Sequence, residues 1–141
     1  MTDETKRPVG VTKDVGFQIG VRRALPIQLE AACQLLTSAG GRGIWLGSPG
    51  DISLTKGDRY KLEDGLTGEV RVFKPLSNLR ITWQPCGWPR ASTIQVRVIP
   101  KDTRAVIAFH QESLPGATEW EERRAHFAAA LDKLESIIQS Q

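Results

Sequence analysis

Two histidines and two cysteines are the side chains of this sequence best suited to acid–base, nucleophilic or metal chemistry. His110 lies in an apolar segment in phase with Val106 and Ala108. We interpret it as a hydrogen-bonded histidine near a strand end, and a polar anchor or acid–base group in a ligand pocket is the alternative. His126 falls outside the apolar stripe of the C-terminal segment, which predicts that it faces solvent.

The arrangement of these residues predicts neither catalysis nor metal binding. Cys33 and Cys86 are far apart, in no metal or redox spacing, so we expect two reduced thiols. Two single histidines with scattered carboxylates do not supply the three or four converging ligands of a metal site. The sequence offers no Ser–His–Asp or Cys–His arrangement, no paired carboxylates and no phosphate-binding loop. We therefore predict no catalytic residue, no metal and no cofactor.

The composition is that of an ordinary globular protein and excludes several classes of partner. The 141 residues suit one domain, and 40% are hydrophobic and 25% charged. A formal charge of +3 without a basic run or a cluster of stacking residues argues against nucleic-acid binding. No apolar run approaches the ~20 residues that cross a membrane, and the polar start lacks the pattern of a signal peptide. We expect a cytoplasmic protein with a flexible tail over residues 1–14 and a single domain over 15–141.

Hydrophobic periodicity predicts an α+β fold. Period-two alternation indicates a strand at 17–25, and five further strands follow between residues 59 and 114. A helix is expected to begin at Pro26, and a short turn or helix carries Ile44, Trp45 and Leu46. A long helix is expected from Thr118 to about Gln139, with apolar residues on one stripe. The simplest packing lays this helix across the covered face of an antiparallel sheet.

The first expected hairpin has a register that its apolar pattern favours. A three-residue loop at 64–66 would place Tyr60 opposite Val70 and Leu62 opposite Gly68, so that apolar residues share one face. A two-residue loop would exchange the two faces of one strand, because side chains alternate along it. We therefore predict the three-residue loop.

The second expected hairpin is predicted to place its apolar face against the long helix. A break near residues 75–78 would set Val72 opposite Ile81 and Val70 opposite Trp83. The opposite face would be largely polar, as in a sheet covered on one side only. That outer face is predicted to carry Arg71, Arg80 and Arg97 on neighbouring strands. They either keep the face soluble or form a docking stripe for an acidic partner.

Five stretches, taken in order, carry a resemblance to a known family. They are "GVRRALPIQLEAACQLLTS", "IWLG", "GDRYKLEDGLTGEVRVFKPLSNLRITW", and "DTRAVIAFHQESL" with the later "WEERRAHFAAALDKLESI". Over about residues 15–138 the chain resembles the START and birch-pollen-allergen (SRPBCC) superfamily, in its AHSA-type branch of heat-shock-protein-90 ATPase activators. Cys33 stands where several members carry Trp. The resemblance implies a helix-grip fold, with a curved six-stranded antiparallel sheet wrapped around a long C-terminal helix and two short helices after the first strand.

The resemblance also implies a pocket between the concave sheet face and the long helix. The registers above name the expected ligand-binding residues: Trp45, Tyr60, Leu62, Val70, Val72, Ile81, Trp83, Ile94, Val96, His110, Trp120, Phe127 and Leu131. Aromatic side chains suit such a pocket because they offer large, stiff apolar surfaces. The alternative is that the tryptophans fill this volume.

Three hypotheses for function follow. The first is non-enzymatic binding of a small hydrophobic or amphipathic molecule, which predicts a continuous cavity with few charged walls. The second is a chaperone-associated protein-interaction module, which predicts a filled interior and an exposed apolar or arginine-lined patch. The third is a cyclase-like or hydrolase-like enzyme, which predicts a buried titratable pair in the pocket, with His110 as the first candidate.

Overall fold

The computed structural model describes residues 11–12, 16–47 and 53–140, which form one antiparallel sheet and three helices. The strands are β1 (Val11–Thr12), β2 (Gly16–Leu25), β3 (Arg59–Lys61), β4 (Thr67–Lys74), β5 (Asn78–Trp83), β6 (Ser92–Lys101) and β7 (Arg104–Leu114). The helices are α1 (Leu29–Thr37), α2 (Ala39–Trp45) and α3 (Ala117–Gln139). The spatial order of strands is β1-β2-β7-β6-β5-β4-β3.

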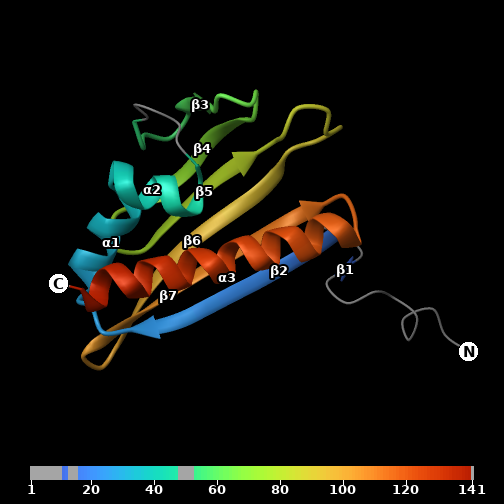
Figure 1. Cartoon of the computed structure of the whole chain (residues 1–141). Coiled ribbons are helices and arrows are strands. Elements are labelled where there is room, and N and C mark those ends of the chain that lie inside the picture. The colour runs from blue at the N-terminus through green and yellow to red at the C-terminus, as the bar shows by residue number, and fades with distance from the viewer. Residues whose placement is uncertain (1–10, 13–15, 48–52, 141) are drawn as a thin grey trace, which may run out of the picture.

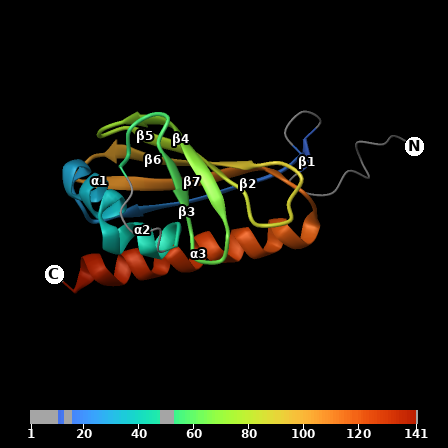
Figure 2. The same ribbon diagram turned by 90° about the horizontal axis from the view of Figure 1, so that it is seen from above.

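Helix α3 crosses one face of this sheet (Figure 1). It lies mainly along β2 and also contacts β7 and α2, while α1 packs against β6 and β7. Figure 2 shows the sheet edge-on, with α3 running beneath it and α1 and α2 at one end. The six expected strands, the two short helices and the long C-terminal helix are all confirmed.

Part of the expected tail adds to the sheet. Val11 and Thr12 form β1, in which Val11 pairs with Phe17 of β2. The other residues of the predicted 1–14 tail lie outside the described residues. We continue to propose a single domain over 15–141.

The core beneath α3 is filled by a run of aromatic rings. The rings of Trp45 and Phe109 lie 6.1 Å apart between centroids, and Phe109 stacks on Phe127 at 4.8 Å. All three side chains are fully or almost fully buried. Because close-packed rings leave little free volume, the middle of the space between sheet and α3 is solid.

The helical region after β2 is divided at Ser38 into α1 and α2. Ser38 ends α1 and caps α2, where its hydroxyl accepts a hydrogen bond from the Gly41 amide at 3.1 Å. A serine at the N-cap satisfies an amide that the helix itself leaves free. Gly41 lies inside α2, and a Cβ there would come within 1.6 Å of the Leu35 carbonyl oxygen. This glycine therefore permits the close packing of α2 on α1.

The β3–β4 hairpin has a three-residue loop, but one position earlier than predicted. The loop is 63–65, closed by a hydrogen bond from the Leu62 amide to the Leu66 carbonyl at 2.8 Å. Tyr60 therefore lies opposite Gly68, not Val70. Moving the loop by one residue shifts the pairing by two, so each side chain keeps the face that was predicted for it.

A β-bulge in β4 overturns the predicted position of Val72. Val70 pairs with Ile81, whereas Val72 pairs with Arg80 and Phe73 with Leu79. A bulge inserts one unpaired residue and reverses the alternation of faces beyond it. Val72 therefore points to the outer face with Arg80, and the neighbouring phenylalanine points inward.

Candidate functional site

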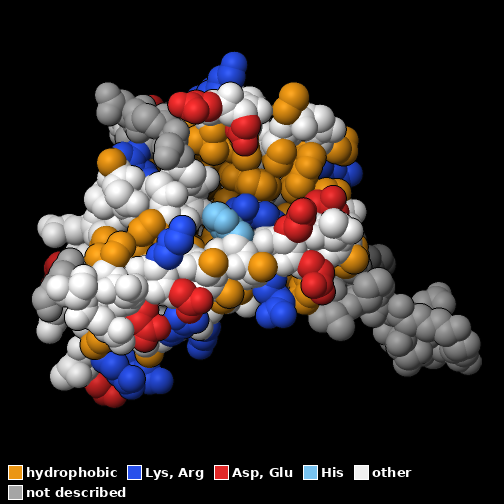
Figure 3. All heavy atoms as spheres, viewed as in Figure 1, with side chains coloured by type: hydrophobic (Ala, Val, Ile, Leu, Met, Phe, Trp, Pro, Cys, Tyr) orange, Lys and Arg blue, Asp and Glu red, His pale blue; other side chains and the backbone are white. Residues whose placement is uncertain are grey.

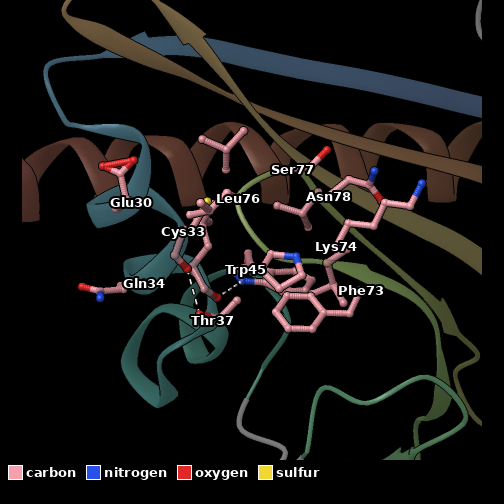
Figure 4. Close-up of a pocket in the computed structure, with 15 residues that line it drawn as sticks. Glu30, Cys33, Gln34, Thr37, Trp45, Phe73, Lys74, Leu76, Ser77 and Asn78 are labelled. Carbon is pink, nitrogen blue, oxygen red and sulfur yellow. Dashed lines mark hydrogen bonds between the residues drawn. The ribbon is translucent and has the colours of Figure 1, made fainter.

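A cavity of about 280 Å³ lies between α1 and the turn that joins β4 to β5 (Figure 4). Helices α1 and α2 contribute Cys33, Leu36 and Trp45 to its lining. The β4–β5 hairpin contributes Phe73, Leu76 and Leu79, and β6 contributes Val96 and Val98. The walls are predominantly apolar, which is the usual character of a small-molecule site.

The turn at the cavity is held in an unusual backbone conformation. Leu76 has a φ of 67° and is 48% exposed, although its side chain is large and apolar. The amide of Ser77 donates to the Lys74 carbonyl at 3.0 Å, and the Ser77 carbonyl accepts from Val98 at 3.0 Å. A non-glycine residue with positive φ is uncommon and costs conformational energy. The turn is therefore tied to β6 with an apolar side chain at the rim of the cavity.

The polar groups of the inner wall are engaged with the backbone. The Trp45 indole donates to the Leu36 carbonyl at 2.9 Å, and the Thr37 hydroxyl donates to the Cys33 carbonyl at 2.8 Å. Burial raises the pKa of the Cys33 thiol, so the thiol is a neutral wall group. Glu30 and Lys74 also line the cavity and are exposed, so the charges lie towards solvent. This arrangement suits an apolar guest.

The structure separates the residues that were expected to share one pocket. Trp45 and Val96 line the cavity. Seven others are buried in the core: Tyr60, Val70, Ile81, Trp83, Ile94, Phe127 and Leu131. Leu62 and Trp120 are half-buried and pack against this core. The cavity thus forms at the end of the sheet covered by α1, and no described residue of α3 lines it.

His110 and Val72 lie on the opposite face of the sheet from the expected pocket. His110 pairs with Gly20 and Gln95, and its Nε2 lies 3.1 Å from the Gln18 side-chain oxygen. Its neighbours in sequence, Phe109 and Gln111, point inward and are fully buried. The interpretation of His110 as a hydrogen-bonded histidine agrees with this geometry, whereas its place in a pocket beneath α3 was wrong.

His126, which was expected to face solvent, is half-buried against the core. Its Nε2 lies 2.7 Å from the Trp45 carbonyl oxygen, and its ring packs edge-on to Phe127 with centroids 5.1 Å apart. Burial lowers the pKa of His126, and the nearby charge of Arg123 adds to this effect. The neutral imidazole therefore donates to the carbonyl and joins α3 to the end of α2.

A polar chain crosses the interior between α3 and the sheet. The Arg123 Nε donates to Gln111 Oε1 at 2.9 Å, and Gln111 Nε2 donates to Ser92 Oγ at 2.8 Å. The Ser92 hydroxyl in turn donates to the Trp83 carbonyl at 2.9 Å. Gln111 and Ser92 are fully buried. Such a chain is stable because each buried polar group in it finds a partner.

Figure 3 shows a second hollow on the same side of the molecule as α3. It lies between α3 and the β3–β4 end of the sheet, and hydrophobic side chains cover its floor. A histidine and a Lys or Arg side chain stand where this floor meets α3. Helix α3 carries Arg123 and His126, which are three residues apart and so share one side of the helix.

Comparison with known proteins identifies the fold. No protein-family model and no curated protein matches the sequence. CalU16 from Micromonospora echinospora superposes with a TM-score of 0.75 at 19% identity, covering 86% of this chain and 75% of that one. PFC0360w, an HSP90 activator from Plasmodium falciparum, has a TM-score of 0.72 at 17% identity, covering 86% and 96%. The Aha1 dimer from Colwellia psychrerythraea gives 0.63 at 19% identity, covering 84% and 92%.

The chain has the helix-grip fold. The helix-grip architecture that the resemblance implied is confirmed, because an HSP90 activator and an Aha1 structure share it. At such low identity the likeness extends to the fold alone.

Residues 11–12, 16–47 and 53–140 contain no group of three or more His, Cys, Asp or Glu side chains that could hold a metal ion. No helix in these ranges is long and apolar enough to cross a membrane.

Several residues of the helix-grip site escaped the sequence analysis for identifiable reasons. Phe73 was placed on the outer face because the bulge cannot be read from alternation. Leu76 was taken as part of a polar break, since it stands between Pro75 and Ser77. Arg123 was not singled out from the sequence. Its position on the same side as Phe127, four residues on, was the available signal.

Proposed function

We propose that this protein binds a small hydrophobic or amphipathic molecule without chemical conversion, in the cavity between α1 and the β4–β5 turn. The observation that supports this is the apolar lining of that cavity, from Leu36 and Trp45 on one side to Val96 and Val98 on the other. The charged neighbours lie towards solvent, as the binding hypothesis predicts.

The size of the cavity limits the ligand class. A volume of about 280 Å³ lies near the lower end of the range for small-molecule sites, about 300–1,000 Å³. We therefore favour a single-ring or short-chain guest over a lipid. The exposed Leu76 at the rim would cover part of such a guest and bury its own apolar surface in doing so.

Thermal unfolding with neutral apolar probes tests the proposal. Toluene, indole and cyclohexane should raise the melting temperature in a saturable manner, because a ligand that binds the native state stabilises it. Val98→Phe places a ring in the cavity and should abolish this response. Val72→Phe is the matched control, since it adds the same ring on the outer face of the sheet, and it should respond as the wild type does.

Either of two results would reject this proposal. One is a melting temperature that no probe raises in the wild type. The other is a full response in Val98→Phe, which would locate the probe elsewhere. In NMR spectra, toluene should shift the methyl resonances of Val96 in the wild type. The same resonances should remain unchanged in Val98→Phe.

A second candidate is docking of an acidic protein surface on the outer face of the sheet. Arg22 and Arg97 both pair with Ala108 and so lie in one row across the strands. Arg80 lies in the next row, donating to Gln95 at 2.7 Å. A shallow hollow of about 350 Å³ includes these three exposed arginines. Arg71 does not line this hollow and instead lies 4.0 Å from Glu69.

The structural neighbours supply the partner to test for this second candidate. PFC0360w is an HSP90 activator, so purified HSP90 is the first choice. Charge reversal of Arg22, Arg80 and Arg97 to Glu should abolish binding if this face docks the chaperone, and raised salt should weaken it. Binding that survives the triple reversal would exclude this surface.

A further inference from the structure

We propose that Arg123 and Trp83 form a recognition site for the carboxylate of a small, flat acid, separate from the apolar cavity beside α1. Two unused hydrogen-bond donors carry this inference. Nη2 of Arg123 and Nε1 of Trp83 are both buried, and neither has a hydrogen-bond partner. Buried donors are rarely left unpaired, because a buried N–H without an acceptor has lost its hydrogen bond to water and gained none in return.

The two donors belong to groups in direct contact. The guanidinium carbon of Arg123 lies 4.0 Å from the centroid of the Trp83 ring and 5.0 Å from that of Phe127. In this proposal, one acceptor group beside the stack receives an N–H of Arg123 and the indole N–H of Trp83. A carboxylate provides two oxygen atoms in one plane, which is the geometry that arginine binds best.

The orientation of Arg123 is fixed by its other donor. Its Nε is used by Gln111, which is itself held by Ser92. The neutral Gln111 acceptor therefore anchors the guanidinium from the sheet side. Nη2 remains available to donate a hydrogen bond to a ligand. A preorganised donor of this kind loses little conformational entropy when a ligand arrives.

The charge around Arg123 favours an anion. No carboxylate among residues 11–12, 16–47 and 53–140 forms an ion pair with it. Burial lowers the pKa of Arg123 to about 10, although the nearby Tyr60 and Glu122 act in the opposite direction. A ligand carboxylate would add to this compensation and meet the unused hydrogen bonds.

The neighbouring side chains indicate a flat ligand. Trp88 packs edge-on to Trp83 with ring centroids 5.5 Å apart, and Tyr60 is close enough for the charge of Arg123 to act on its hydroxyl. In Figure 3 the hydrophobic floor of the hollow meets a Lys or Arg side chain beside α3. Aromatic faces and a cation at one end match an aromatic carboxylate.

This site and the cavity of the proposed function lie on two sides of one aromatic wall. Trp45 lines the cavity, Phe109 contacts Trp45, and Phe127 stacks on Phe109 and lies under Arg123. Blocking one site should leave the other intact, so the two proposals can fail independently.

The indole N–H of Trp83 reports on the site directly. Trp45 and Trp120 already donate to carbonyls at 2.9 and 2.8 Å, whereas Trp83 does not. In proton–nitrogen correlation spectra, benzoate should move the Trp83 indole proton downfield in a saturable manner. Benzyl alcohol, which has the same ring without the charge, should have a much smaller effect. The resonance is assigned by its loss in Trp83→Phe.

Two arginine variants separate the site from general charge effects. Arg123→Met keeps an apolar stem over Trp83 and should weaken benzoate binding at least about tenfold. Arg124→Met is the matched control, because Arg124 is exposed and lies over Trp120 instead, and it should bind as the wild type does. Val98→Phe, which fills the other cavity, should also bind benzoate normally.

Trp83→Phe provides a second test that conserves packing. It removes one donor and should weaken benzoate binding severalfold while the fold is retained. The proposal is overturned if benzoate leaves the Trp83 resonance unmoved, or if Arg123→Met binds benzoate as tightly as Arg124→Met. A Trp83 indole that exchanges magnetisation with a bound water and ignores benzoate would likewise overturn it, since water would then satisfy the donors.

Discussion

The ring of Tyr60 lies directly over the backbone of Gly68, and its hydroxyl donates to the carbonyl of Thr82 two strands away. A Cβ at position 68 would approach the Tyr60 ring to 2.3 Å and the Thr82 oxygen to 2.1 Å. The absence of a side chain at one position therefore lets a tyrosine tie β3 to β5. Desolvation raises the pKa of Tyr60, so the phenol stays neutral and keeps its proton for this bond.

Gly68→Ala should destabilise the protein by about 3 kcal/mol or more, because both atoms in the way belong to well-anchored groups. Urea unfolding measures the loss. Gly20→Ala is the matched control: Gly20 is also in a strand, but nothing lies within 4 Å of its Cβ position. This control should change stability by less than about 1 kcal/mol. Equal losses in the two variants would contradict the close approach at Gly68.

The alternation of apolar and polar residues, and the residues that begin and end helices and strands, predicted the architecture because those signals are local in the sequence. Each strand with one covered face, such as Ile94–Val96–Val98, shows its period in the sequence itself. The β4 bulge has only a weak signal, because "VRV" alternates as an unbroken strand would and only the apolar Phe73 after it departs from the pattern. Of the expected lining residues, Trp45 and Val96 line the cavity beside α1, and the others do not for a geometric reason. Whether aromatic side chains line a space or fill it depends on how Trp45, Phe109 and Phe127 stack, which involves three distant segments.

Trp45 serves both as core and as cavity wall, and its substitution should show both roles. Trp45→Phe leaves the Leu36 carbonyl without its indole donor and should cost about 1–3 kcal/mol. Trp45→Ala also removes the contact with Phe109 and should cost about 3–5 kcal/mol. Chemical denaturation measures both losses. If Trp45→Phe costs nothing, the indole hydrogen bond is not a stabilising contact.

Stability should fall in mild acid through His126. Burial and the nearby charges of Arg123 and Lys133 lower its folded pKa below the ordinary value near 6.5, while the hydrogen bond to the Trp45 carbonyl opposes this. Between the folded and the unfolded pKa the unfolded chain binds more protons. This stability is therefore complete above about pH 6.5 and is lost as pH falls towards the folded pKa.

His126→Gln should remove that part of the pH dependence. Glutamine can still donate to the carbonyl but does not titrate, so the difference in unfolding free energy between variant and wild type should change between pH 8 and pH 5. Urea unfolding at four pH values gives this difference. A constant difference across the range would mean that His126 keeps an ordinary pKa in the folded protein.

Gln111 and Arg123 should be energetically coupled, and a double-mutant cycle can measure this. Gln111→Met leaves the Arg123 Nε without its acceptor, and Arg123→Met leaves the Gln111 oxygen without its donor. The double variant orphans neither, so it should be about 1–2 kcal/mol more stable than the sum of the two single losses predicts. Arg124→Met combined with Gln111→Met should be additive, because Arg124 contacts Trp120 and not the polar chain. Additivity in the first pair would show that the 2.9 Å contact does not hold Arg123 in place, and the preorganised anion site would then lose its foundation.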